Sequence, residues 1–218
     1  MTMKLYLYQH CPFCIRPRIV AGFKKIPLEL IFLANDDEKA HLDLIGKKQV
    51  PFLQKENGNF LIESLDICQY LNNFDRKPIL SQEIVTTDTL IKLISDINNA
   101  SKSVVYPRFI NHPQNHQDFP TQSAKDYFEH KKEKYIGCFK ANLRFPQASI
   151  DKTTPLLDVL NTFLTHPFAS GDQLSWDDIM LFPVLRNLTI IQDLITIPSK
   201  VKHYIKNICQ LTGIQPYQ

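Results

Sequence analysis

The sequence has no long apolar run and no strong excess of charge of either sign. No apolar stretch approaches the ~18 residues that a membrane-spanning helix needs, and the apolar run within residues 1–10 is too short for a secretory leader. The formal net charge is +3, from 25 basic and 22 acidic residues, and is too small and too mixed to indicate a nucleic-acid partner. We therefore expect a cytoplasmic protein that binds neither membranes nor nucleic acids.

Cysteine is scarce and unevenly placed. The number of cysteines, five, is odd, and only Cys11 and Cys14 lie close together in the sequence. A disulfide framework is therefore not expected, and the second close pair that a zinc ribbon needs is missing. Cys68, Cys138 and Cys209 fall in helical patterns and are interpreted as small buried apolar side chains.

The remaining composition is that of an ordinary globular protein. Hydrophobic residues make up 44% of the 218 residues and charged residues 22%. Up to residue 74, strand and helix patterns alternate, and an Asn-Gly turn signal separates the last two strands. The expected strands are 3–8, 28–33, 50–54 and 58–62, and the expected helices begin at Pro12 and cover 36–46 and 63–74. This order predicts a small four-stranded mixed sheet with three helices.

After a linker at 75–82 the strand signals nearly vanish. Apolar residues recur at helical spacing in 89–98, 124–143, 154–164, 175–191 and 199–211. The predicted organisation is therefore an α/β domain at 1–74 and an all-α domain at 83–218. One helix start is unusually clear, because Ser175 and Asp178 have the spacing of a capping box.

The segment CPFC at 11–14 places a cysteine between a strand and a helix. There the sulfur of Cys11 would face the unpaired N–H groups of Phe13 and Cys14 and the positive end of the helix dipole. Cysteines in such positions have pKa values of about 3.5 to 7.5. Arg16 adds positive potential, and Arg18 adds more unless it points to solvent.

Cys14 lies one helical turn after Cys11, on the same face, so a disulfide between them closes with little backbone movement. An attacking thiolate and a second thiol that releases the mixed disulfide are what thiol–disulfide exchange needs. Two alternatives remain: both cysteines are packed in the core, or they share a metal site with the neighbouring His10. The strand–CxxC–helix context favours the redox interpretation.

Two further segments fit a redox site. Proline at position 51 cannot donate to a β-ladder and suits an exposed peptide, although only ~5% of X–Pro bonds are cis. If the Val50–Pro51 bond is cis, the backbone of Val50 can pair with an extended peptide. Glu63 and Ser64 open the next helix, where a hydroxyl beside free N–H groups can bind a carboxylate. The alternative is that Ser64 simply caps its own helix.

These three segments, in this order, resemble the glutaredoxin branch of the thioredoxin fold. The segments are CPFC at 11–14, QVPFL at 49–53 and ESLDICQYL at 63–71. With LSWDDIMLFPVLRNLT at 174–189 and IPSKVKHYIKN at 197–207, the chain resembles the two-domain bacterial glutaredoxins of the glutaredoxin 2 type, which share their architecture with glutathione transferases. The resemblance is dense in 3–80 and 174–206 and fades across 100–165.

The resemblance implies a role for each matching residue. Cys11 would be the nucleophile that accepts glutathione, and Cys14 the resolving cysteine. Pro51 would be the cis-proline, with Val50 pairing through its backbone with the cysteinyl part of glutathione.

The remaining glutathione contacts follow from the same resemblance. Glu63 and Ser64 would hold the γ-glutamyl end, and Pro12 and Phe13 would line the site. The chain departs from the family pattern at Phe13, where glutaredoxins usually have tyrosine, and at Gln49, where the small glutaredoxins have threonine. Lys48 is a candidate for the glycine carboxylate.

The leading hypothesis is a glutathione-dependent thiol–disulfide oxidoreductase. Glutathione is its cosubstrate, and neither a metal nor a flavin is expected. Its other partners would be protein disulfides or glutathionylated proteins, and a monomer is the working expectation. One alternative is a glutathione transferase or dehydroascorbate-type reductase, which needs no second cysteine. The other is a non-catalytic interaction module, with a basic and aromatic surface of Tyr127, Lys131, Lys132, Lys134 and Tyr135.

Overall fold

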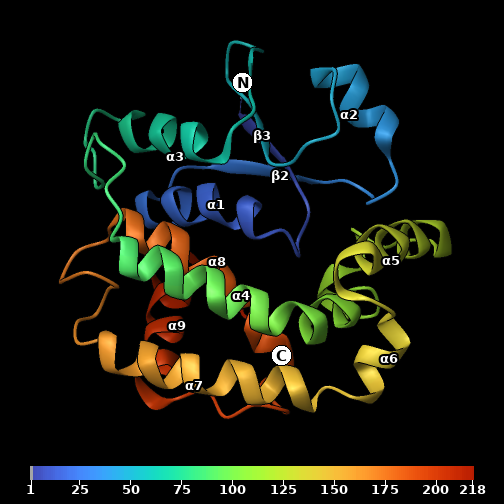
Figure 1. The fold of residues 1–218 in the computed structure, drawn as a ribbon. Helices are drawn as coiled ribbons and strands as arrows, with labels where there is room; N and C mark the ends of the chain where they lie inside the picture. The colour runs from blue at the N-terminus through green and yellow to red at the C-terminus, as the bar shows by residue number, and fades with distance from the viewer. Residues whose placement is uncertain (1) are drawn as a thin grey trace.

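The computed structural model describes residues 2–218 and begins with a four-stranded mixed sheet and three helices (Figure 1). The elements are β1 (Met3–Leu7), α1 (Pro12–Lys24), β2 (Leu28–Phe32), α2 (Glu38–Ile45), β3 (Phe52–Gln54), β4 (Phe60–Leu61) and α3 (Ser64–Asn73). The strand order is β2-β1-β3-β4, with β1 parallel to β2 and antiparallel to β3. The fold class predicted for this part is confirmed.

The predicted hairpin turn between β3 and β4 forms at Asn57 and Gly58. Gly58 has a φ of +86°, which a glycine adopts without steric cost. Its N–H donates to the carbonyl of Lys55, and the N–H of Lys55 donates to the carbonyl of Asn59, both at 2.9 Å. The turn fixes the register of β4 on β3, in which Leu53 pairs with Leu61 and Gln54 with Phe60.

Helices make up the rest of the chain. They are α4 (Asp88–Phe109), α5 (Gln122–Ile136), α6 (Phe139–Arg144), α7 (Gln147–Phe163), α8 (Trp176–Leu188) and α9 (Ser199–Thr212), with single 3₁₀ turns at Pro113–Asn115 and Thr189–Ile191. The helical pattern at 124–143 falls on two helices, because Gly137, with φ +75°, lies between them. The domain limits at 74 and 83 stay a prediction.

The capping box at the start of α8 is confirmed. The backbone N–H of Ser175 donates to the carboxylate of Asp178 at 2.8 Å, and the backbone N–H of Asp178 donates to the side chain of Ser175. Asp178 also accepts from the N–H of Ala169 at 2.8 Å and from the hydroxyl of Tyr204 at 2.9 Å. One buried carboxylate therefore joins α8, α9 and the preceding loop.

The helical part packs directly on α1. Figure 1 shows α1 beside α3 on one side and close to α8 on the other, and α1 contacts both α8 and α9. The main hydrophobic core runs without a break from Leu5 and Ile19 through Ile67 to Leu185 and Ile208. A smaller core lies toward α2 and contains Leu7, Phe52 and both active-site candidates. No helix within residues 2–218 has the length and apolar character to cross a membrane.

The close approach of α1 and α9 depends on a glycine. A Cβ added to Gly22 would lie 2.2 Å from the carbonyl oxygen of Thr212 and 2.9 Å from its carbonyl carbon. These are backbone atoms, so relief requires the two helices to separate.

We expect Gly22→Ala to destabilise the protein by about 2 kcal/mol, even though alanine is ordinarily the better helix former. Urea denaturation at constant protein concentration measures the change. A rise in stability, as an ordinary glycine-to-alanine change within a helix produces, would contradict the close approach.

Candidate active site

Cys11 is the N-cap residue of α1, at the end of the turn that follows β1. Its backbone is extended, with φ −75° and ψ 118°, and Pro12 occupies the first helical turn. The sulfur therefore lies where the first N–H groups of the helix have no partner within it. Only 9% of Cys11 is exposed, but it lines a cavity together with Phe13 and Val50. This is the placement that the sequence predicts.

The two thiols have opposite electrostatic environments. A hydrogen bond from the Cys14 thiol, with further bonds from the N–H groups of Cys14 and Phe13, lowers the pKa of Cys11; burial and the charge of Asp118 oppose this. Cys14 is fully buried, and burial together with the neighbouring Cys11 raises its pKa well above the ordinary value. Of the two cysteines, Cys11 is therefore the one that ionises more readily, and Cys14 is the one that keeps its proton.

The two arginines of α1 differ from one another in position. Arg16 lies over the ring of Phe13 at 4.6 Å and donates to the hydroxyl of Ser64 at 3.3 Å. Arg18 donates to the side-chain oxygen of Gln9 at 3.0 Å, and burial lowers its pKa to about 10. The alternative that Arg18 points to solvent is wrong, since it packs where the helical part meets α1.

The Val50–Pro51 peptide bond is cis. Neither the N–H nor the carbonyl of Val50 makes a backbone hydrogen bond within residues 2–218. Both residues border a cavity of about 620 Å³, which is lined by Phe13, Arg16, Gln49, Val50, Pro51, Glu63, Ser64, Leu65, Asp66 and Ile84. The structure thus brings together five of the predicted glutathione contacts at this cavity, while Pro12 lines a second cavity together with Cys11.

The start of α3 differs from one sequence interpretation. The N-cap is Glu63 and not Ser64, and no side chain caps this helix. The Ser64 hydroxyl instead accepts from Arg16, and the Glu63 carboxylate accepts from the side-chain amide of Gln49 at 3.1 Å. The interpretation of Ser64 as a cap is therefore wrong, because α3 begins at Ser64 itself and the hydroxyl points toward α1.

A second cavity, of about 300 Å³, is lined by Cys11 itself. Its far side is formed by four residues of α5, which we call the α5 wall: Tyr127, Phe128, Lys131 and Lys132. Tyr106 and Phe109 of α4 complete that side. Lys48 borders the cavity as well, with its ammonium 3.7 Å from the ring centre of Tyr127 and 3.6 Å from the carboxylate of Glu38.

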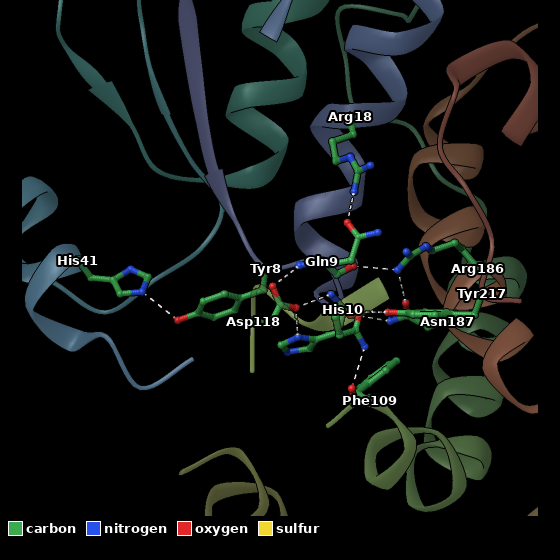
Figure 2. A network of polar contacts seen from close by, with 11 residues as sticks. Tyr8, Gln9, His10, Arg18, His41, Phe109, Asp118, Arg186, Asn187 and Tyr217 are labelled. Atoms are coloured by element: carbon green, nitrogen blue, oxygen red, sulfur yellow. Dashed lines mark hydrogen bonds and ion pairs between the residues drawn. The ribbon is translucent and has the colours of Figure 1, made fainter. Parts of the chain in front are cut away.

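A buried carboxylate from the helical part fixes the turn before Cys11 (Figure 2). Asp118 accepts hydrogen bonds from the backbone N–H groups of Gln9, at 2.8 Å, and His10, at 3.0 Å. Its second oxygen also lies 2.7 Å from Nδ1 of the His10 ring. That ring stacks on Phe119, with centroids 5.1 Å apart. His10 therefore serves the domain contact, and no group of three metal-ligating side chains gathers within residues 2–218.

The same turn is held from α8. Arg186 donates to the carbonyl of Gln9 at 2.8 Å, and Asn187 donates to the carbonyl of His10 at 2.9 Å. Figure 2 shows both side chains reaching the turn opposite Asp118. All four polar backbone groups of the two residues before Cys11 are thus bonded to the helical part.

Several of these residues were not identified from the sequence as part of the site. Asp118, Arg186 and Asn187 lie more than a hundred positions from the turn they hold, and no local spacing marks them. The sequence identified the α5 wall only as part of a basic and aromatic surface and did not place it next to Cys11. The interpretation of Cys138 as a buried apolar side chain is also wrong, because Cys138 is exposed at the N-cap of α6.

The comparisons with known proteins cover both parts of the chain. Residues 89–218 match the family model described as Glutaredoxin 2, C terminal domain, and residues 5–78 match that of Glutathione S-transferase, N-terminal domain. Glutaredoxin 2 of Escherichia coli K12 is 37% identical over 212 residues, which are 97% of this chain and 96% of that protein.

Solved structures agree with these matches. The crystal structure of glutaredoxin 2 from Salmonella typhimurium in complex with glutathione is 39% identical, with a TM-score of 0.91 over 99% of this chain and 96% of that chain. Glutathione transferase Omega 3C from Trametes versicolor has a TM-score of 0.57 over 100% of this chain and 90% of that chain; at 18% identity it shows a shared fold alone.

Proposed function

Because the chain belongs to the glutaredoxin 2 family, and is a glutathione-dependent thiol–disulfide oxidoreductase, we propose that Cys11 is its nucleophile and Cys14 its resolving thiol. The observation that supports these roles is the opposite perturbation of the two thiols at the start of α1. The sulfur favoured as thiolate lines one cavity beside Phe13 and Val50, which border both cavities, and the sulfur favoured as thiol is buried.

In the first step the Cys11 thiolate attacks one sulfur of a substrate disulfide. A new bond joins the Cys11 sulfur to that sulfur, and the other substrate sulfur leaves with the electron pair and takes up a proton from water. In the second step Cys14 loses its proton and attacks the Cys11 sulfur, which releases the remaining substrate thiolate. Two molecules of glutathione then reduce the Cys11–Cys14 disulfide and leave as glutathione disulfide.

The high pKa of Cys14 does not block the second step. Its proton is retained in the dithiol state partly because Cys11 is negatively charged and accepts a bond from it. Once Cys11 forms the mixed disulfide, that charge is gone, so the pKa of Cys14 falls toward the value set by burial. Burial, the largest cause of the high pKa of Cys14, remains, but the thiol loses its proton more readily once the substrate is bound to Cys11.

Glutathione fits the larger cavity in one direction. The free backbone groups of Val50 pair with its cysteinyl residue, and the γ-glutamyl end reaches Glu63 and Ser64. The carboxylate of the γ-glutamyl end pairs with Arg16, whose guanidinium donates to the hydroxyl of Ser64. Glu63 accepts the γ-glutamyl ammonium, and Phe13 and Pro12 flank the sulfur.

The substrates that fit this chemistry are protein disulfides and glutathionylated proteins. The protein acts on them as a monomer. A reducing compartment such as the cytoplasm supplies the glutathione that regenerates the dithiol. Electrons then pass from glutathione to the substrate through the two cysteines, so no metal or flavin takes part in the proposed cycle.

The alkylation of Cys11 at different pH values tests its role as nucleophile. We expect the rate with iodoacetamide to rise with pH and to level off well below about 8.5, the ordinary pKa of a free cysteine, because only the thiolate reacts. Peptide mass spectrometry resolves Cys11 from the other four cysteines, and N-acetylcysteine serves as the reference thiol. A profile that coincides with the reference would exclude Cys11 as an activated nucleophile.

A further inference from the structure

The side of the second cavity formed by α4 and α5 is not used by the glutathione site described above. Pro51, Glu63 and Ser64 line the larger cavity alone, Cys11, Pro12 and Lys48 line the second cavity alone, and the two cavities share only Phe13, Gln49 and Val50. In thiol–disulfide exchange the incoming and leaving sulfurs lie on opposite sides of the sulfur that is attacked. When the Cys11 thiolate attacks the sulfur of a glutathione held at Val50, the other half of the mixed disulfide therefore leaves on the side away from Cys11, and the α5 wall lies across the second cavity from Cys11.

The α5 wall has an excess of positive charge. No carboxylate within residues 2–218 lies within 4.0 Å of the ammonium of Lys131 or Lys132. Lys48, which faces the same space, has Glu38 as its partner at 3.6 Å. The two lysines of α5 are thus the ammonium groups of this cavity that lack a carboxylate.

Lys132 is half-buried in spite of its charge. Its ammonium lies 5.1 Å from the ring centre of Tyr106 and 5.5 Å from that of Phe128. Burial and the adjacent Lys131 lower the pKa of Lys132, while the charge of Cys11 acts in the opposite direction. Lys132 therefore lies within electrostatic reach of the reacting sulfur, and an added carboxylate would compensate the lost hydration of its ammonium.

We propose that Lys131 and Lys132 select the protein substrate, by binding a carboxylate side chain next to the cysteine that forms the mixed disulfide with glutathione. The inference rests on the proposed function and names the substrate class of the same site. Tyr106, Tyr127 and Phe128 supply the apolar surface against which the peptide packs beside its charge. An acidic segment is favoured and a basic segment is repelled.

The carboxylates of glutathione itself do not account for these two lysines. Its γ-glutamyl carboxylate lies at Arg16 in the proposed binding mode, in the other cavity. Its glycine carboxylate follows the cysteinyl residue along Val50, and Lys48 is two positions from Val50 in the chain and borders the cavity there. Lys131 and Lys132 lie on the opposite side of the cavity. They are therefore available to bind the protein half of the mixed disulfide.

Three glutathionylated peptides test the proposal. They share one sequence except at the two positions flanking cysteine, which are Glu, Gln or Lys. For the unmodified protein we expect kcat/KM for the Glu peptide to exceed that for the Gln peptide about tenfold, the effect of two partly exposed charge pairs, and the Lys peptide to be slower still. The preference should shrink as NaCl is added, because salt screens such pairs.

The matched variants are Lys131→Gln with Lys132→Gln, and Lys134→Gln as control. Lys134 is exposed on the same helix and does not line the cavity. We expect the double variant to lose the preference for the Glu peptide, to within about twofold of equal rates, and the control variant to keep it. Because each variant is compared with itself on three peptides, a general loss of activity does not affect the result.

The outcomes separate this inference from the proposed function. Equal rates for the three peptides with the unmodified protein would overturn the inference alone. A double variant that keeps the peptide preference but has a higher KM for glutathione would assign the lysines to the incoming glutathione and overturn the inference as well. Failure to turn over any of the peptides would overturn the proposed function together with it.

Discussion

Replacing Cys11 by serine is expected to abolish oxidoreductase activity, with a loss of more than about a thousandfold toward every disulfide substrate. A serine hydroxyl is not ionised at neutral pH. The hydrogen bonds that lower the pKa of Cys11 are too weak to ionise a hydroxyl, so the variant has no nucleophile at this position. After exposure to oxidised glutathione, mass spectrometry of the unmodified protein should show an adduct on Cys11 or a Cys11–Cys14 disulfide. The Cys11→Ser variant should show neither at this site.

The matched variant Cys14→Ser separates the two routes of the reaction. A serine hydroxyl at this position can still donate to the Cys11 sulfur, so the low pKa of Cys11 should persist. Glutathionylated substrates should still be reduced, since free glutathione resolves the mixed disulfide, whereas reduction of an intramolecular protein disulfide should collapse. Unchanged reduction of such disulfides by Cys14→Ser would contradict the role of Cys14, and is the behaviour expected of a transferase.

The chemistry at the start of α1 could be predicted because it is local. A strand, a CxxC segment and a helix with proline at its start determine where the first sulfur lies and which N–H groups it meets. The same holds for the turn at Gly58 and the capping box at Ser175, where neighbours a few positions apart determine the geometry.

The parts that could not be predicted depend on contacts distant in the sequence. The hydroxyl of Ser64 does not cap α3 but accepts a hydrogen bond from Arg16, which lies 48 positions away. The exposure of Cys138 follows from the break at Gly137, which turns an apparent position within a helix into an N-cap. Lys132 could be recognised as basic, but only the packing of α5 opposite Cys11 brings it to the site.

The most consequential of these distant contacts are those of Asp118 with the turn before Cys11. The side chain of Asp118 is fully buried and is the only acceptor in Figure 2 for two adjacent backbone N–H groups, those of Gln9 and His10. We expect Asp118→Ala to lower the free energy of unfolding by about 3 kcal/mol or more, because both N–H groups and the His10 ring lose their partner in a buried site. Urea denaturation measures this loss, and a change within experimental error would contradict the anchoring role of Asp118.

The conservative variant Asp118→Asn distinguishes anchoring from charge. An amide oxygen can still accept from part of the turn, so we expect a smaller loss of about 1–2 kcal/mol and a folded protein whose Cys11 can be titrated. The negative charge of Asp118 raises the pKa of Cys11, so its removal should move the alkylation profile to lower pH while stability falls. A shift to higher pH, toward the reference thiol, would instead mean that the turn has moved and that the sulfur has left the helix start. The direction of that shift therefore reports whether the helical part acts on Cys11 through its charge or through the position of the turn.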